Sequence, residues 1–549
     1  MMKKVIKKLL AALLAVAMVC AMAIPAFADT EGDVDSHHTY SAFQIFSGDV
    51  KGEGNDIKDF KISNVKWGSN ITDPAAFLEQ LRNDSTIGTQ FQFADATDAA
   101  DAATVQKVLA VINGWQDSDP NSIAFARFVC HYLYPDAGAD PKPVVRAGSN
   151  SLTIPYAGYY LIVDTTPFSP GDSYHSYNSF LLMVTKTNWN VTITPKAEKP
   201  TVEKEVFDNF DNQDGTSTGG FGSSADHAIN EKFQFKLTAT LPKSEGNDHA
   251  YDYYGKYSVI FHDTLSDGIT YDKDDELDSV VIKSNGNTYN ITDSSKYTID
   301  TTDLESQNSF VVNIDVKACA KDAGFDLNNG ATITVTYTAH LNENAYVNTA
   351  GGSTSNINKV YLTYSNNPKD ESSIGKTPES TPVYVYTYQL NNTKLAENEH
   401  GAPLPGAGFR LYSDKDCTQE VKLYQKDNFY FPIKDATDKK AVEEMYSDKD
   451  GKFNIKGLDA GTYYLRETNP PKDYSACADK EIVISATHNG NHVDLDSSKL
   501  STTIINKKDG GITLPSTGGI GTTIFYVVGG GLMVAAIVLL VTKKRMENK

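Results

Sequence analysis

Three polar side chains in the last third of the chain, Lys394, Glu467 and Asn506, are spaced so that a β-fold would bury them together. Residues two apart in a strand point to the same face of a sheet. Each of the three follows an apolar alternation with that period, set by Tyr384, Tyr386, Tyr388 and Leu390 before Lys394, Tyr463 and Leu465 before Glu467, and Ile504 before Asn506. The sequence therefore predicts that all three point into one apolar interior.

Burial of these groups favours a reaction between them. A low-dielectric interior lowers the pKa of a lysine and raises that of a carboxyl, so the amine becomes nucleophilic and the acid keeps its proton. A protonated Glu467 can polarise the amide of Asn506, and rigid packing supplies the proximity. The predicted product is an isopeptide bond between Lys394 and Asn506, formed with loss of ammonia.

The middle of the chain repeats this arrangement. Three more polar residues continue apolar alternations: Lys204 with Val202 and Val206, Asp263 with Tyr257, Val259 and Phe261, and Asn366 with Val360, Leu362 and Tyr364. We expect a second isopeptide bond between Lys204 and Asn366, with Asp263 as the carboxyl that moves the proton. The alternative for Asp263 is a cap of the turn before Gly268.

The elements that would position these side chains are short strands. After residue 150 the chain alternates apolar and polar residues in segments rich in Thr, Tyr, Val and Ile, separated by Asn, Asp and Gly turns, which is typical of antiparallel sandwiches. Residues 105–115 and 122–133 instead have helical spacing. We therefore expect a mainly β protein with helices inserted into its first domain.

Both ends of the chain indicate export. Four lysines, an apolar stretch over 9–24 and the small residues of Ala26-Phe27-Ala28 predict a signal peptide. Near the other end, the uncharged segment 520–542 is long enough to cross a hydrocarbon core and is followed by a basic stop. With linker signals at 195–200 and 367–382, the expected boundaries are 1–28 for the signal, 29–196, 197–382 and 383–510 for three domains, and 511–549 for a membrane-spanning tail.

Charge and cysteine content restrict the function classes. The net charge of −20 disfavours binding to nucleic acid and favours solubility. Of the five cysteines, Cys417 and Cys477 are the only pair within one expected domain, and they form either a disulfide or two free thiols. Spacings typical of zinc ligands, phosphate loops and nucleophile elbows do not occur in the sequence, so we expect no metal, no cofactor and no turnover of an external substrate.

Several motifs resemble one family. Leu514-Pro515-Ser516-Thr517-Gly518, with its hydrophobic stretch and basic tail, is similar to a sortase sorting signal. Segments 404–409 and 461–468 resemble a CnaB-type domain, and segments 40–48 and 66–69 resemble the N-terminal domain of sortase-polymerised backbone pilins of Gram-positive bacteria. The resemblance implies a major shaft subunit with three tandem Ig-like or CnaB-type β-sandwich domains.

The same resemblance implies a polymer. A sortase would cleave between Thr517 and Gly518 and transfer Thr517 to a lysine of the next subunit. The family's acceptor lies in a pilin motif whose layout is matched by Trp189, Val191, Ile193, Thr194, Pro195 and Lys196, with Thr194 in place of a tyrosine. Lys196 is therefore the expected acceptor, and its alternative is a solvated linker charge.

Partners and location follow from this resemblance. It implies a pilus-specific class C sortase, identical pilin subunits, ancillary tip and base pilins, and attachment to peptidoglycan by a housekeeping sortase. The protein would lie in a surface pilus anchored to the cell wall and support adhesion and colonisation, with an unidentified host or extracellular-matrix receptor. A monomeric wall-anchored adhesin and a wall-anchored enzyme are the alternatives.

The first domain departs from the family pattern. Asp164 ends a strand-like segment, 158–164, that looks like the acid-bearing strand. Ala197 nevertheless stands where cross-linking members have an asparagine, and the segment 36–40 contains no lysine. We therefore expect no isopeptide bond there, with Asp164 either a relic or a structural hydrogen-bond acceptor.

Two other patterns are only weakly similar to metal-binding sites. The Asp-rich segments 211–215 and 448–451 do not place a ligand at the first position of a calcium loop, and turns are the better interpretation. His37 and His38 could bind a metal, but a solvated terminus is the simpler expectation.

Overall fold

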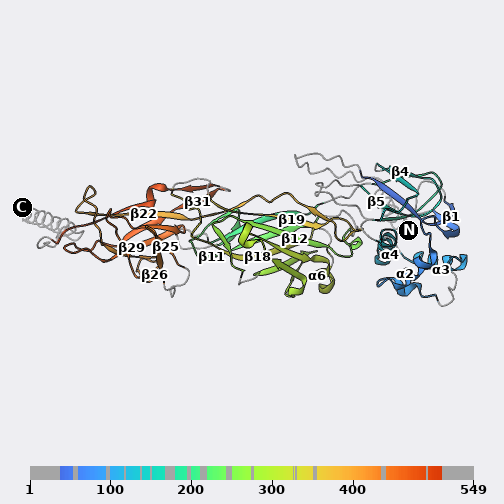
Figure 1. The fold of residues 1–549 in the computed structure, drawn as a ribbon, viewed down its shortest axis with the longest axis horizontal. Helices are drawn as coiled ribbons and strands as arrows, with labels where there is room; N and C mark the ends of the chain where they lie inside the picture. Colours follow the sequence, from blue (N-terminus) through green and yellow to red (C-terminus); the bar gives the residue numbers. More distant parts are fainter. Residues whose placement is uncertain are drawn as a thin grey trace, which may run out of the picture.

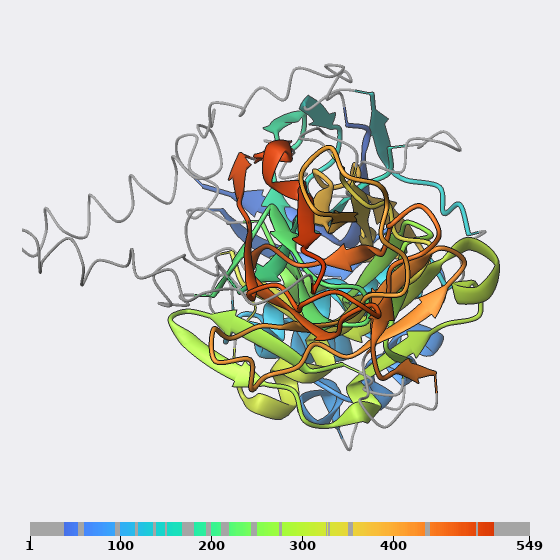
Figure 2. The same ribbon diagram turned by 90° about the vertical axis from the view of Figure 1, so that its left-hand side faces the viewer.

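The computed structural model describes three β-rich units that lie in a row along the long axis of the molecule (Figure 1). The units also lie one behind another when the molecule is viewed from its C-terminal end (Figure 2). The residues that the structure describes are 38–52, 60–93, 99–115, 119–135, 139–148, 151–166, 180–193, 199–209, 219–242, 250–273, 277–325, 327, 330–349, 355–433, 440–489 and 492–509.

The first unit combines a sheet with three α-helices. Its elements are β1 (Tyr40–Lys51), β2 (Lys61–Trp67), α2 (Pro74–Asn83), η2 (Gly88–Phe91), α3 (Ala102–Ile112), α4 (Pro120–Leu133), β3 (Val145–Ala147), β4 (Ser151–Ile154), β5 (Gly158–Asp164), β6 (Leu181–Thr185) and β7 (Trp189–Thr192). The sheet has the order β2-β1-β5-β6, β3 pairs with β1, and β4 pairs with β7. The helices expected over 105–115 and 122–133 are confirmed as α3 and α4, and α2 is a further helix.

Strand parity gives the first unit two cores. In β5, Leu161 and Val163 pack with the helices, while Tyr160 and Ile162 pack with the β4–β7 ribbon on the other face. Each α-helix begins at an aspartate whose carboxylate accepts a backbone N–H of the first turn, the residues being Asp73, Asp101 and Asp119. The helices therefore cover one face of the sheet and leave its strand ends accessible to the second unit.

The central unit is a sandwich of two sheets. Its elements are β8 (Thr201–Asp208), β9 (Gly220–Gly222), β10 (Ser224–Asp226), β11 (Lys232–Thr240), η3 (Ala250–Tyr253), β12 (Ser258–Leu265), β13 (Ile269–Tyr271), β14 (Ser279–Ser284), β15 (Asn287–Asn290), η5 (Ser294–Lys296), β16 (Tyr297–Asp300), α5 (Leu304–Gln307), β17 (Ser309–Asp315), α6 (Val316–Ala323), β18 (Thr332–Leu341), β19 (Asn356–Ser365), β20 (Ile374–Lys376) and β21 (Val383–Tyr386). One sheet has the order β15-β14-β18-β11-β8-β9, with β13 on β18. The other has the order β10-β21-β19-β12-β17-β16, with β20 on β19.

The alternation expected in this unit is observed. Side chains with the phase of Phe233 in β11 and Ile333 in β18 are buried between the sheets, and their neighbours in sequence are more exposed. The second sheet continues past the expected boundary at residue 383, because β21 pairs with β10 and β19. The change of unit therefore falls at Thr387, between β21 and the next strand.

The C-terminal unit is a second sandwich. Its elements are β22 (Tyr388–Ala396), β23 (Gly408–Tyr412), β24 (Leu423–Lys426), β25 (Phe429–Pro432), β26 (Ala441–Val442), β27 (Met445–Tyr446), β28 (Asn454–Leu458), β29 (Gly461–Asn469), β30 (Lys480–Ile484), β31 (Ala486–Asn489), β32 (His492–Leu495), η6 (Ser497–Leu500) and β33 (Ser501–Asn506). A sheet of order β26-β24-β25-β28-β22-β33 faces one of order β27-β23-β29-β30, and β31 pairs with β32.

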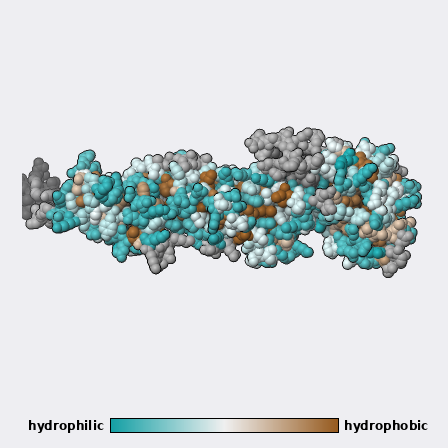
Figure 3. Space-filling model, viewed as in Figure 1, coloured by the Kyte–Doolittle hydropathy of each residue, from teal (hydrophilic) through white to brown (hydrophobic). Residues whose placement is uncertain are grey.

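The face of the molecule drawn in Figure 3 is mostly hydrophilic, with small hydrophobic patches between polar ones. This surface agrees with the net charge of −20. Within the described ranges, none of the helices is long and apolar enough to span a bilayer. The expected signal peptide, the acceptor Lys196, the sorting signal 514–518 and the membrane-spanning tail all lie outside the described residues.

Candidate cross-linking sites

The C-terminal unit brings Lys394, Glu467 and Asn506 together, as the sequence predicted. Lys394 lies on β22 and Asn506 ends β33, the parallel neighbour of β22, where Lys394 pairs with Ile504 and Ala396 with Asn506. Glu467 reaches the same space from β29 in the opposite sheet. Lys394, Glu467 and Asn506 are only 0%, 7% and 1% exposed, so the site is closed to bulk water.

The three side chains form a closed set of contacts. The Lys394 Nζ donates to Asn506 Oδ1 and lies 3.5 Å from Glu467 Oε1. Asn506 Nδ2 donates to the same Glu467 oxygen at 2.7 Å. The other carboxylate oxygen accepts the backbone N–H of Cys477 at 2.8 Å, which fixes the carboxyl group. Glu467 is therefore within reach of both the lysine amine and the amide nitrogen.

Burial has the expected electrostatic effect on Lys394. Desolvation lowers its pKa, although the nearby Cys477 and Glu467 oppose that shift. The amine also lies 5.5 Å from the centre of the Phe409 ring, in the apolar part of the core. These surroundings favour the neutral amine that an attack on an amide carbon requires.

A second buried lysine lies between the two sheets of the central unit. Lys204 on β8 donates to Asp263 Oδ2 on β12, which belongs to the opposite sheet. Tyr337 on β18 accepts a hydrogen bond from Lys204 Nζ at 3.3 Å. The expected contact between Lys204 and Asp263 is thus observed, and Asp263 is not a turn cap, because it lies inside β12.

The asparagine at this site is Asn358, not Asn366. Asn358 is fully buried on β19, and its Nδ2 donates to the Tyr337 hydroxyl at 2.7 Å. Asp263 pairs with Val360 across the β12–β19 ladder, so Asn358 is its diagonal neighbour on the same face. Asn358 has the strand parity that the sequence analysis required of the asparagine, but the analysis missed it.

The prediction of Asn366 as the partner of Lys204 is wrong for a geometrical reason. Asn366 follows the last residue of β19, and its Oδ1 accepts from Ser373 at 2.8 Å. It lies eight positions beyond Asn358, or about 26 Å along an extended strand. Both asparagines have the same parity, and parity does not determine which of them lies opposite Asp263.

Burial shifts the pKa of the lysine in the same direction at the central site as at the C-terminal site. Burial lowers the pKa of Lys204 to about 8 and raises that of Asp263 above its ordinary value. Two oxygens, Asp263 Oδ1 and Asn358 Oδ1, are buried without a hydrogen bond. The hydrogen-bonding groups of Tyr337 and Asn358 nevertheless oppose the rise in the pKa of Asp263.

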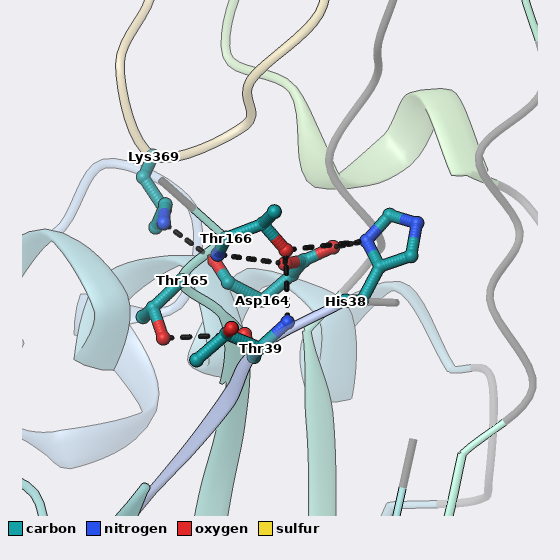
Figure 4. Close-up of polar contacts among 6 residues, drawn as sticks. All are labelled: His38, Thr39, Asp164, Thr165, Thr166 and Lys369. Atoms are coloured by element: carbon teal, nitrogen blue, oxygen red, sulfur yellow. Dashed lines mark hydrogen bonds and ion pairs between the residues drawn. The ribbon is translucent and has the colours of Figure 1, made fainter. Parts of the chain in front are cut away.

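The first unit has a different contact at the equivalent acid (Figure 4). His38 Nδ1 lies 2.5 Å from Asp164 Oδ2, and the hydroxyl and backbone N–H of Thr166 donate to Oδ1 at 2.5 and 3.1 Å. The backbone oxygen of Asp164 accepts from Lys369 Nζ of the central unit at 2.5 Å. Asp164 is therefore a structural acceptor, one of the two expected roles, and His38 is packed against it rather than being part of a free terminus.

The pKa of Asp164 reflects these contacts. Burial raises it, but the hydrogen bonds and charge of His38 together with the hydrogen bonds of Thr166 outweigh burial, so the net shift is downward. A lowered pKa in the folded state stabilises the fold above the unfolded pKa. That contribution disappears as pH falls through the folded pKa.

Cys417 and Cys477 are free thiols, so the expected disulfide is not formed and the alternative of two thiols is observed. The Cys417 Sγ lies 3.8 Å from Asp479, a partner of Arg466 on the outer face of β29. The Cys477 thiol instead interacts electrostatically with Lys394 and Glu467, which lie at the inner face. The two thiols lie on opposite sides of the sheet. Cys130 and Cys319 are buried free thiols as well.

The segment 448–451 is a turn, as expected. Asp448 Oδ1 accepts the backbone N–H groups of Asp450 and Lys452 at 2.9 and 2.7 Å. The similar segment 211–215 lies outside the described residues.

Comparisons with known proteins match the end of the chain most directly. A family model of the SpaA prealbumin-like fold domain matches residues 389–499, and a model of the LPXTG cell wall anchor motif matches residues 506–548. A search of curated proteins found no match. The first match contains Lys394 and Glu467, and the second begins at Asn506.

Solved structures similar to the chain include three Gram-positive pilins. A 35 kDa C-terminal fragment of a major pilin of Streptococcus agalactiae is 21% identical, covering 56% of this chain and all of that chain at a TM-score of 0.38. A backbone pilin of Streptococcus pyogenes is 16% identical over 87% of this chain and 97% of that chain, with a TM-score of 0.41. The full-length major pilin of Corynebacterium diphtheriae is 19% identical over 69% and 86%, with a TM-score of 0.40.

Replacing Asp164 by Asn should destabilise the first unit selectively. The change removes a charge that is buried beside His38 and hydrogen-bonded to Thr166, so we expect a loss of about 2–4 kcal/mol. Hydrogen exchange of β1 and β5 peptides measures it, and the difference from wild type should shrink as pH falls below about 4, the unfolded pKa, and be lost only below the lowered folded pKa. The exposed Asp140→Asn is the matched control, and equal protection in the two variants would contradict the assignment.

Proposed function

We propose that this cell-wall-anchored protein is the shaft subunit of a covalent surface pilus, joined end to end by a sortase and cross-linked within its units by isopeptide bonds. The observation that carries the proposal is a buried lysine in contact with a carboxyl group, with an asparagine beside them, in each of two successive units. Support for sortase processing comes from the LPXTG anchor motif over residues 506–548. Together these features suit a chain that bears pulling force along its length.

The C-terminal geometry supports a defined reaction. The neutral amine of Lys394 attacks the amide carbon of Asn506, forming a C–N bond. Glu467 takes the proton that the amine loses and delivers it to the departing amide nitrogen, since its Oε1 is 3.5 Å from the first nitrogen and 2.7 Å from the second. Ammonia leaves, and no oxidant or cofactor is needed. The fold acts once on itself, so the protein is not a turnover enzyme.

The position of this bond suits a load-bearing role. It would join β22, the first strand of the unit, to β33, its last strand, and enclose 112 residues of sequence separation. Pulling on the two ends of the unit would then load the covalent bond, and the hydrogen bonds of the enclosed strands would not carry the force.

The central unit supports the same chemistry with Lys204, Asp263 and Asn358. The bond would connect β8 in one sheet with β19 in the other, across the core. Tyr337 lies between the reactants, 3.3 Å from the lysine amine and 2.7 Å from the amide nitrogen, and so positions both. Asp263 is the proposed proton carrier, because it is the carboxyl that contacts Lys204.

Polymerisation is proposed to use the ends of the first and last units. Thr517, released from Gly518 by cleavage within Leu514-Pro515-Ser516-Thr517-Gly518, would be transferred to Lys196 of the next subunit. Lys196 falls between β7 and β8, at the proposed domain boundary, where an enzyme could reach it without opening a sheet. A class C sortase, ancillary tip and base pilins, and peptidoglycan attachment of the last subunit complete this proposal, with adhesion and colonisation as its biological role.

Intact mass tests the internal bonds. Each isopeptide bond expels one ammonia through a proximity-driven reaction, so the folded chain should be lighter by about 17 Da per bond, or about 34 Da for two. Asn358→Ala should restore one of the two losses, whereas the matched Asn366→Ala should leave both. Two ammonia losses in Asn358→Ala, relative to the calculated mass of that variant, would contradict the central assignment. No ammonia loss in wild type would contradict it as well.

The C-terminal bond should also contribute stability. Asn506→Ala removes the acyl group, so its loop is no longer closed and we expect the unit to lose about 4–5 kcal/mol by the chain-entropy argument. Urea denaturation followed with limited proteolysis measures the loss. Thr503→Ala, on the exposed side of the same strand, is the control and should keep both the mass loss and the stability.

Covalent ladders test the polymer. Wild-type cells should yield high-molecular-weight species on denaturing gels, and Lys196→Ala should collapse them to the monomer because the acceptor amine is gone. Lys199→Ala, three residues on, should keep the ladder. A ladder that survives Lys196→Ala would exclude this acceptor, and a wild type without any ladder would favour the monomeric adhesin.

A further inference from the structure

The contact between the central and C-terminal units contains a group of titratable side chains that the cross-linking chemistry does not use. We call it the interface cluster. Its members are Asp208, Asp226, His227 and Glu231 from the central unit and Asp459 and His488 from the C-terminal unit. The elements that carry them, including β31, meet where these units adjoin (Figure 1).

The interface cluster divides into two trios, each with ligands from both units. In one, His227, Glu231 and Asp459 each offer a ligand atom within 4.8 Å of the others. In the second, the same is true of Asp208, Asp226 and His488. The six residues come from four separate segments of the chain, at 208, 226–231, 459 and 488, so no spacing motif revealed the whole cluster, and the sequence analysis expected no metal.

His227 is held in the orientation of a metal ligand. Its Nε2 lies 2.8 Å from the carbonyl oxygen of Phe207, which fixes that nitrogen as the N–H donor. In the neutral ring the Nδ1 lone pair would then point into the first trio, where this buried atom lies 3.4 Å from Glu231 Oε1 without a hydrogen bond of normal geometry. Metal-binding histidines commonly have their second nitrogen fixed by such a carbonyl.

The ring and the carboxylate are both held in place by further contacts. The His227 ring is only 1% exposed and stacks on Phe233 at 4.2 Å between ring centres. Glu231 accepts the backbone N–H of Ala228 at 2.9 Å and the side-chain amide of Asn209 at 3.1 Å. These supporting contacts leave the first trio preorganised.

Charge favours a cation at this place. The interface cluster contains four carboxylates and two imidazoles in a largely buried space. Asp459 shares this space with the carboxylates of Asp226, Glu231 and Asp208. A bound divalent ion would offset this repulsion between like charges.

The donor set selects the kind of ion. Imidazole nitrogen with carboxylate oxygen suits zinc and related transition metals, whereas calcium and magnesium prefer oxygen ligands alone. A tetrahedral zinc with ligands at about 2.0–2.2 Å requires neighbouring ligand atoms roughly 3.3–3.6 Å apart. The 3.4 Å between His227 Nδ1 and Glu231 Oε1 meets that requirement. In the second trio, His488 Nε2 is 2.5 Å from Asp226 Oδ1, which is a direct hydrogen bond.

We propose that His227, Glu231 and Asp459 bind a divalent transition metal of the zinc class, with the second trio as nearby compensating charge, and that this metal clamps the C-terminal unit onto the central unit. The clamp adds a tether beside the single chain crossing at Thr387. The clamp does not depend on polymerisation, so the metal proposal can be tested independently of the pilus proposal.

Packing around the interface cluster supports the clamp. The Ile229 N–H donates to the Gly457 carbonyl at 2.9 Å, and Asn230 Nδ2 donates to the Pro432 carbonyl at 2.9 Å. Gly457 has φ +83°, and a Cβ there would lie 2.5 Å from Ile229. The two units therefore approach closely on either side of Asp459, which keeps the ligands from both units within reach of one ion.

Zinc binding to the full chain tests the proposal, with zinc chloride alone as the probe. Calorimetry and metal analysis after dialysis should find about one zinc per chain, and equal calcium or magnesium should not compete. His227→Ala and Asp459→Asn should each weaken binding at least about 10-fold. The exposed His492→Ala should leave it unchanged, and the circular dichroism spectrum and thermal unfolding of each variant verify folding independently.

The second measurement is hydrogen exchange at the contact between the units. Zinc should reduce hydrogen exchange at Ala228–Asn230 and around Asp459 in wild type but not in Asp459→Asn. Absence of zinc binding, or binding that persists in both ligand variants, would overturn the proposal. If protection from hydrogen exchange changes with pH but not with zinc, the interface cluster is a protonated His227–Glu231 pair. That result would also overturn the metal proposal.

Discussion

The structure depends on one electrostatic constraint, which is that a lysine amine cannot remain isolated in an apolar interior. Lys394 and Lys204 are both placed there by strand parity, and each amine contacts a carboxyl group or an amide oxygen that compensates its burial. Desolvation drives both amines toward the neutral form. The same burial that makes the lysines costly is what makes them reactive, and strands from both sheets are arranged around each of them.

The two sites differ in which sheets carry the lysine, the acid and the asparagine. In the C-terminal unit the lysine and asparagine lie on parallel neighbouring strands of one sheet, and the acid comes from the opposite sheet. In the central unit the lysine lies in one sheet, and the acid and asparagine lie in the other. There the Tyr337 hydroxyl accepts hydrogen bonds from both the lysine and the asparagine. In the first unit a histidine lies beside Asp164 where the other units have a lysine beside the acid, and this contact has no means to form an amide.

The contacts between units are also polar and specific. Lys369 of the central unit reaches the backbone of Asp164, so the acid of the first unit is adjacent to the joint between the first two units. At the second joint, His488 contacts Ser224 and Asp226, and Lys426 pairs with Glu343 at 2.7 Å. If the interiors are cross-linked as proposed, the remaining compliance of the row lies at these joints, so their chemistry bears on the stiffness of the whole chain.

The sequence by itself determined the fold class, two helices of the first unit, and the interior phase of Lys394, Glu467 and Asn506, and it offered Asp263 as one of two interpretations for the acid beside Lys204. These features follow from local periodicity, which strand and helix geometry impose on the chain. Only the tertiary structure decided that Asn358 rather than Asn366 lies beside Asp263, because register between strands depends on pairing partners and not on parity. It alone separated the thiols of Cys417 and Cys477 and assembled the interface cluster, since residues from distant segments meet there through packing that no local pattern encodes.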